Sequence, residues 1–178
     1  MSVPLLILPE MSKRAKIEDA LASTGEYRSI VTMSRLGAGL RYLEVTADDS
    51  IVVLPTAFGF PAIESFMQEA TDLKRQRHLC YMFVVEPKER ATDVIVDSLI
   101  LGAHGLLCEP FSSDYIAKAI SMAMILGREG SYKNLEITKH IVADALSRMF
   151  SLNKFNQDGL LCKLMRYIER KPHQCDSC

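Results

Sequence analysis

The sequence has no long apolar run, no large excess of charge of one sign and no internal repeat. Its uninterrupted apolar stretches, such as Tyr81 to Val85, are far shorter than the roughly 20 residues that span a bilayer. Val3 to Leu8 is too short for the apolar core of a signal peptide. We therefore expect a cytoplasmic protein without membrane insertion. The formal net charge of −1 gives no general indication of nucleic-acid binding.

Cysteine is scarce, and the five residues cannot all pair with one another. Cys80 and Cys108 lie in strand-like apolar runs, where a small hydrophobic side chain would serve equally well, so we expect reduced thiols. His173, Cys175 and Cys178 are residue types that bind zinc. They supply only three ligands at a chain end, and we favour a loose tail over a metal site.

The 178 residues are 48% hydrophobic and 24% charged, which is typical of a soluble domain with a short appendage. Residues 1–127 carry 12 basic and 16 acidic side chains, whereas residues 128–178 carry 9 and 6. This change coincides with the segment from Gly127 to Ser131. We expect a first domain over 1–127 and an extension over 128–178.

Short apolar runs alternate with amphipathic segments along the first domain. The pattern predicts strands at 4–8, 28–33, 50–54, 79–85 and 105–108, and helices at 12–22, 37–44, 61–70, 94–101 and 114–127. Such alternation predicts an α/β fold, a parallel sheet with helices on both faces. The flavodoxin-like doubly wound order 2-1-3-4-5 is the commonest for five strands, and it places function at the carboxyl ends of the strands.

The segment from Gly102 to Phe111 reads Gly-Ala-His-Gly-Leu-Leu-Cys-Glu-Pro-Phe. It resembles the last strand of the receiver domain of two-component response regulators, Gly-Ala-x-x-Tyr-x-x-Lys-Pro-Phe. Ala62 to Glu64 is similar to the Gly-Leu-Glu that follows the third strand of that family. The resemblance covers about residues 3–127. It implies a CheY-like fold, a role in bacterial signalling and a cis peptide bond before Pro110.

The residues that carry phosphoryl chemistry in that family are replaced here. Receivers use two acidic residues after the first strand to hold magnesium, an aspartate as phosphoryl acceptor, a Ser or Thr after the fourth strand, and a lysine before the final proline. An aspartyl nucleophile needs such cations to neutralise the charge on the transferring group. The matched positions hold Pro9 and Glu10, Leu54 (or Pro55 with a shift of one), one of Val85, Glu86 and Pro87, and Glu109, while Leu106 replaces the aromatic switch residue.

The resemblance therefore implies a receiver-like domain that lacks its phosphorylation site, has no enzymatic activity and needs no cofactor. Glu10, Glu86 and Glu109 should all emerge at the carboxyl edge of the sheet. Three carboxylates are a weak candidate for a divalent-cation site. We favour three solvated glutamates at loop starts.

Two further amphipathic segments predict helices at about 133–152 and 157–171, separated by a turn around 151–158. A helical hairpin with one apolar face is not stable alone in water and must dock on something. We expect a homodimer in which the last helix of the first domain and the hairpin meet their symmetry mates. The interface candidates are Ile116, Ile120, Met124, Ile141, Ala145, Leu146, Met149, Leu164 and Ile168.

Basic residues form a stripe on the last predicted helix, namely Lys163, Arg166, Arg170 and Lys171. Positive stripes can follow a phosphate backbone, but two helices fall short of the usual three-helix DNA-binding unit. The favoured interpretation is a phosphorylation-independent regulatory or scaffold protein that binds a protein partner. The alternative is a transcriptional regulator whose basic tail binds DNA.

Overall fold

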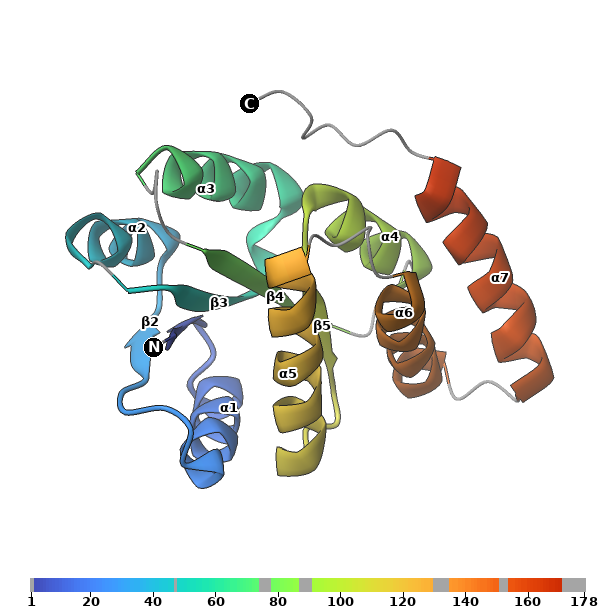
Figure 1. Cartoon of the computed structure of the whole chain (residues 1–178), viewed down its shortest axis with the longest axis horizontal. Coiled ribbons are helices and arrows are strands. Elements are labelled where there is room, and N and C mark those ends of the chain that lie inside the picture. Colours follow the sequence, from blue (N-terminus) through green and yellow to red (C-terminus); the bar gives the residue numbers. More distant parts are fainter. Residues whose placement is uncertain are drawn as a thin grey trace.

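The computed structural model describes residues 2–46, 48–73, 78–86, 91–129, 135–150 and 154–170. Five strands and their helices alternate in the first part of the chain, and two helices follow (Figure 1). In chain order the elements are β1 (Val3–Ile7), α1 (Met11–Thr24), β2 (Val31–Met33), α2 (Leu36–Val45), β3 (Ser50–Pro55), η1 (Thr56–Phe58), α3 (Phe60–Leu73), β4 (Leu79–Val85), α4 (Ala91–Leu101), β5 (Gly105–Cys108), α5 (Ser113–Glu129), α6 (Leu135–Phe150) and α7 (Lys154–Arg170).

The sheet is parallel throughout, in the order β2-β1-β3-β4-β5. The central strands are continuous apolar runs because helices cover both of their faces. Every residue of β3 is buried, and so is every residue of β4 after Leu79. The fold class expected from the sequence is confirmed, including the strand order.

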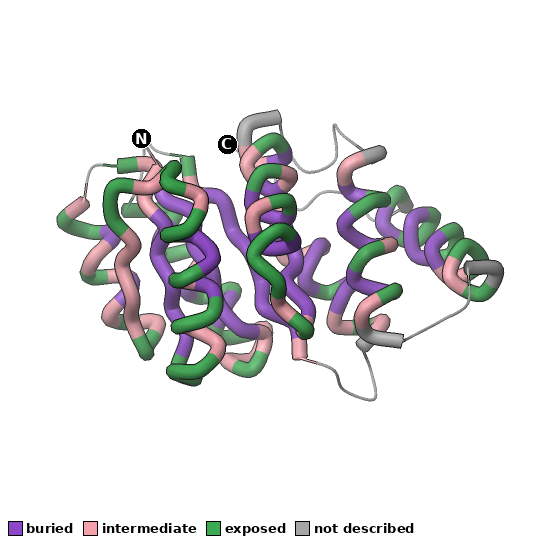
Figure 2. The backbone as a smooth tube through the Cα atoms, turned by 90° about the horizontal axis from the view of Figure 1, so that it is seen from below, coloured by how far each residue is buried: buried purple, intermediate pink, exposed green. Residues whose placement is uncertain are grey.

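Strand alternation divides the buried side chains between two cores, one on each face of the sheet. Leu5, Val52 and Phe83 point into the core that α2, α3 and α4 cover. Their sequence neighbours Leu6, Val53 and Met82 point into the core under α1 and α5. Figure 2 shows the resulting stack of buried strands between helices that are buried on one side only.

Gly105 allows α5 to pack close to the edge strand. A β-carbon at this position would lie 2.8 Å from Cβ of Ala123, which is a buried residue of α5. Side-chain carbons do not approach so closely, so this contact requires glycine at the start of β5.

The C-terminal hairpin of α6 and α7 lies beyond β5, at the edge of the sheet (Figure 1). Its buried side chains, including Val142, Leu146 and Ile168, join the core on the α2–α4 face. The sequence placed Asn156 and Asp158 in a turn, but α7 begins at Lys154 and includes both. Turn propensity is a weak signal, and the packing of α7 on α6, which includes a hydrogen bond from the Gln157 side-chain amide to the Ala143 carbonyl at 2.8 Å, outweighs it.

Among the helices of the described segments, none combines the length and the apolarity needed to cross a membrane.

Candidate functional site

The position that the resemblance assigns to the phosphoryl acceptor is part of the hydrophobic core. Leu54 is completely buried near the end of β3 and packs in the core on the α2–α4 face. Pro55, the alternative match, is also buried and ends the strand. Neither side chain has an oxygen that could attack a phosphoryl group.

The carboxyl edge of the sheet carries a lysine that the sequence interpretation missed. Lys13 lies in the first turn of α1, and its ammonium is 3.0 Å from Glu10 Oε2 and 3.0 Å from Glu86 Oε1. Only 12% of the Lys13 side chain is exposed, against 53% for Glu10 and 27% for Glu86. The ammonium therefore bridges the residue that precedes α1 and the residue that follows β4.

Electrostatics at this edge favour the charged forms of both partners. Burial lowers the pKa of Lys13, but hydrogen bonds to Glu86 and Glu10 and the charges of Glu86 and Glu109 outweigh it and raise the pKa overall. A hydrogen bond from Ser12, whose hydroxyl donates to Glu10 Oε1 at 2.7 Å, lowers the pKa of Glu10, and Lys13 lowers it further. The edge is thus a network in which two carboxylates share one ammonium.

The last strand ends in the geometry that the resemblance implies. The Glu109–Pro110 peptide bond is cis, which confirms the expectation. Leu106, at the position of the aromatic switch residue, is buried in the core. Glu109, at the position of the lysine, is partly exposed. Pro87 lies outside the described residues.

Tyr115 of α5 forms hydrogen bonds with the backbone of the edge strand β5. Its hydroxyl accepts a hydrogen bond from the Cys108 backbone N–H at 2.8 Å and donates one to the Leu106 carbonyl at 3.3 Å. It thereby satisfies two backbone groups of β5, which lies at the edge of the described sheet. Burial raises the pKa of the Cys108 thiol to about 12, so this cysteine is an inert part of the core.

Arg148 connects α6 to this arrangement. Its guanidinium lies 3.4 Å from the centre of the Tyr115 ring. One nitrogen donates to the Pro110 carbonyl at 2.9 Å, and another pairs with Asp144 at 3.0 Å. Arg148 therefore fixes the hairpin to the loop that follows β5. Its spacing of four residues from Asp144 was visible in the sequence, but its partners on α5 and the loop were not.

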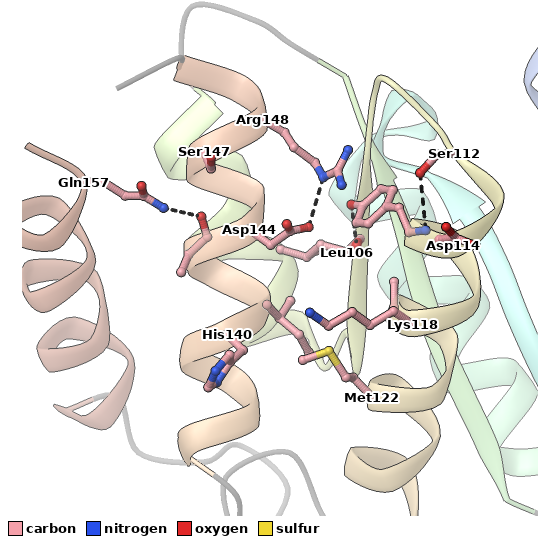
Figure 3. Close-up of a pocket in the computed structure, with 14 residues that line it drawn as sticks. Leu106, Ser112, Asp114, Lys118, Met122, His140, Asp144, Ser147, Arg148 and Gln157 are labelled. Atoms are coloured by element: carbon pink, nitrogen blue, oxygen red, sulfur yellow. Dashed lines mark hydrogen bonds and ion pairs between the residues drawn. The ribbon is translucent and has the colours of Figure 1, made fainter. Parts of the chain in front are cut away.

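A half-open groove of about 540 Å³ runs between α5 and α6 (Figure 3). Leu106 and Ala119 contribute apolar lining. Lys118 and Met122 line it from α5, and Asp144 and Arg148 line it from α6. The groove offers an apolar surface with charges of both signs at its border.

The weak metal candidates form no recognisable cation site. Within the described part of the chain, no three His, Cys, Asp or Glu side chains are grouped in a way that could hold a metal ion. Lys13 lies between Glu10 and Glu86 instead. His173, Cys175 and Cys178 lie outside the described residues.

The expected interface residues are covered by the chain itself. Ile116 and Ile120 pack in the core under α1 and α5, with Met124 against it. Five residues belong to the other core: Ile141, Ala145, Leu146, Leu164 and Ile168. The side chain of Met149 is not described. A dimer through this set stays a prediction, and most of the described part of the apolar face on which it was based is covered within one chain.

On the predicted basic stripe, Lys163 and Arg166 are exposed on α7. The side chain of Arg170 and all of Lys171 lie outside what the structure describes. Arg166 lines a surface hollow together with Asp158 and Glu169, which reduce the positive charge there.

No protein-family model matches this chain, and no curated protein matches it. Solved structures do. A CheY-like response regulator receiver domain protein from Methanospirillum hungatei JF-1 superimposes with a TM-score of 0.51 at 11% identity, covering 71% of this chain and 95% of that one. Full-length FixJ from B. japonicum superimposes with a TM-score of 0.54 at 12% identity, covering 96% of this chain and 91% of that one.

The chain has the receiver fold. At 11% and 12% sequence identity, the likeness supports a shared fold and does not support a shared function. The receiver fold places Glu10, Glu86 and Glu109 at the carboxyl ends of β1, β4 and β5, as the sequence pattern predicted. The sequence interpretation missed Lys13, although its position three residues after Glu10, in the first turn of a predicted helix, was a usable signal.

Proposed function

We propose that this protein is a phosphorylation-independent, receiver-like regulatory or scaffold protein of bacterial signalling, cytoplasmic and without enzymatic activity of its own. It acts by binding a protein partner through a preformed surface. The observation that carries the proposal is the burial of Leu54 where the receiver fold would need a nucleophile. The ion pairs of Lys13 with two carboxylates support it, because they occupy the edge where the chemistry would take place.

The magnesium ion that the receiver fold implies does not fit these residues. A hard divalent cation needs several oxygen ligands. Pro9 and Leu54 supply no side-chain oxygen, and the ammonium of Lys13 lies against the two glutamates nearest the position. We derive no phosphoryl-transfer step for this protein.

Incubation with acetyl phosphate or beryllofluoride plus magnesium tests the proposal. We expect unchanged intact mass and unchanged amide NMR spectra, while a phosphorylatable receiver treated in parallel forms its adduct. A stable adduct within residues 1–127 would overturn the proposal.

The groove between α5 and α6 is our candidate for the partner-binding surface. It combines an apolar lining with a charged border, and Met122 brings an adaptable side chain to it. Met122→Glu should abolish affinity capture of a specific partner by the full chain. Val45→Glu is the matched control, because Val45 is 82% exposed at the end of α2, away from the groove. Equal capture by both variants would exclude the groove.

DNA binding by the hairpin is the second candidate function, favoured by the exposure of Lys163 and Arg166 on α7. Binding through phosphate contacts must weaken steeply as salt rises. Gel shifts at increasing salt should show a complex that Lys163→Glu and Arg166→Glu abolish and Lys16→Glu on α1 leaves intact. The proximity of Asp158 and Glu169 to Arg166 makes this the weaker candidate.

A further inference from the structure

We propose that Lys13 is a built-in cation of the carboxyl edge, held between Glu10 and Glu86 in the position that a divalent metal ion would otherwise take. This inference rests on the proposed function and deepens it, because it names the residue that makes the edge independent of metal. It starts from a disagreement: the receiver fold implies magnesium here, and the residues present do not fit it.

The position of the ammonium is fixed from two elements. Lys13 belongs to the first turn of α1, where the backbone N–H of Arg14 donates to the Glu10 carbonyl at 3.1 Å. Its side chain reaches across to Glu86, 73 residues later in the sequence. The distances to Glu10 Oε2 and Glu86 Oε1 are both 3.0 Å, the length of a charge-assisted hydrogen bond.

The surroundings also hold the charge on Lys13. A poorly exposed ammonium would lose its proton more easily if it were alone. Here the neighbouring carboxylates more than compensate, and Glu109 contributes through its charge. An ion of charge +2 that entered this cluster would meet a fixed positive charge and would have to displace it from two carboxylates.

Removal of the ammonium takes away the cation that the Glu10 and Glu86 carboxylates share. Two carboxylates together with water molecules are enough to hold a small divalent cation. Carboxylate oxygens are the ligands that hard divalent cations prefer. We therefore expect Lys13→Met to acquire a divalent-cation site that the natural chain does not have. Lys13→Arg keeps the charge and should not acquire one.

The experiment uses Mn²⁺ as the probe and the full chain as the protein. Mn²⁺ binding is measured by electron paramagnetic resonance for the natural chain, Lys13→Met, Lys13→Arg and Lys16→Met, an exposed lysine of the same helix. We expect Lys13→Met to bind Mn²⁺ at least tenfold more tightly than the other three. The double variant Lys13→Met, Glu86→Gln should lose that gain, which assigns the site.

Two results would overturn the inference. One is a folded Lys13→Met that binds Mn²⁺ no better than Lys16→Met. The other is selective broadening of the Glu10 and Glu86 amide signals by Mn²⁺ in the natural chain. That measurement needs no variant, so it stays decisive if Lys13→Met does not fold. In that case Lys13→Gln replaces Lys13→Met in the binding experiment, because glutamine keeps most of the side-chain stem and removes the charge.

The outcome is distinguishable from failure of the proposed function. A natural chain that forms an acetyl-phosphate adduct and still excludes Mn²⁺ contradicts phosphorylation independence alone. A Lys13→Met variant that binds Mn²⁺ and forms no adduct supports both statements, because Leu54 still offers no nucleophile.

Discussion

The two cores on opposite faces of the sheet differ in where they end. The core under α1 and α5 takes its side chains from strands and helices of the receiver-like part of the chain. The core under α2, α3 and α4 continues past β5 into α6 and α7. The same parallel sheet therefore supports one core that is closed by its own crossover helices and one that the hairpin extends. From this difference we predict that the core under α1 and α5 keeps its packing when the hairpin is lost.

The largest effect is expected from a charge placed where the hairpin meets the rest of the chain. Leu146 is completely buried in α6. Leu146→Asp should cost at least the roughly 2–5 kcal/mol of a buried Leu→Ala change, because it also buries an unpaired charge. Hydrogen exchange should show α6 and α7 losing protection while β3 and β4 keep theirs.

Ser147→Asp is the matched control, since it adds the same charge at an exposed neighbouring position of α6. Loss of protection throughout the Leu146→Asp chain would contradict this prediction, because the hairpin and the rest of the chain would then unfold as one cooperative unit.

A second prediction concerns the pH dependence of stability and His104, which lies between α4 and β5 and is hydrogen-bonded to Tyr81 of β4. The Tyr81 backbone N–H donates to Nδ1 of His104 at 3.0 Å, and the His104 backbone N–H donates to the Tyr81 carbonyl at 2.8 Å. Burial lowers the pKa of His104 to about 4 from its ordinary value of 6.5. The unfolded chain binds the proton of His104 more tightly than the folded chain does. His104 therefore costs no stability well above pH 6.5, and the free energy of unfolding falls as the pH drops from 6.5 toward 4.

At 1.36 kcal/mol per unit of pKa, the expected loss is about 2 kcal/mol by pH 5 and about 3 kcal/mol once the pH is below 4. Urea unfolding of the natural chain at pH 7, 6 and 5 measures it. His104→Asn keeps a polar side chain that does not titrate in this range and should remove that part of the slope. Equal slopes for the two chains would show that His104 is not held neutral.

The smallest effect is expected at the polar contact between the hairpin and the rest of the chain. Arg148→Met keeps much of the apolar stem and removes the stacking on Tyr115 and the hydrogen bond to the Pro110 carbonyl. We expect a loss of about 1–2 kcal/mol, confined to α6 and the loop after β5. Arg166→Met on α7, an exposed arginine, should change stability by less than about 0.5 kcal/mol.

Hydrogen exchange of α6 separates these outcomes. An Arg148→Met variant with unchanged exchange in α6 would mean that apolar packing alone holds the hairpin on the rest of the chain.

Much of the fold was predictable because buried parallel strands leave a strong pattern. Uninterrupted apolar runs such as Ser50–Pro55 and Leu79–Val85 have few alternatives to a strand covered on both faces. The start of α7 was harder to predict, because Asn156 and Asp158 are turn-favouring residues whose weak preference is outweighed by packing against α6.

The residues of the candidate site were also predictable only in part. That the position matched to the acceptor holds Leu54 or Pro55, neither of which has a nucleophilic side chain, was readable from spacing alone. The role of Lys13 was not, because its second partner, Glu86, is 73 residues away and only the fold brings the two together.

The order of the elements, the parallel sheet and the lack of a nucleophilic side chain at Leu54 follow from local periodicity and residue type, so they were readable without a structure. What covers the apolar stripe of α6 depends on contacts between segments that are distant in the sequence, and these were not readable. The sequence required that the stripe be buried, which a second chain or the chain's own body could do equally well by area. Contacts that depend on shape and direction, the β5 surface around Leu106 and the stacking of Arg148 on Tyr115, place it on the chain's own body.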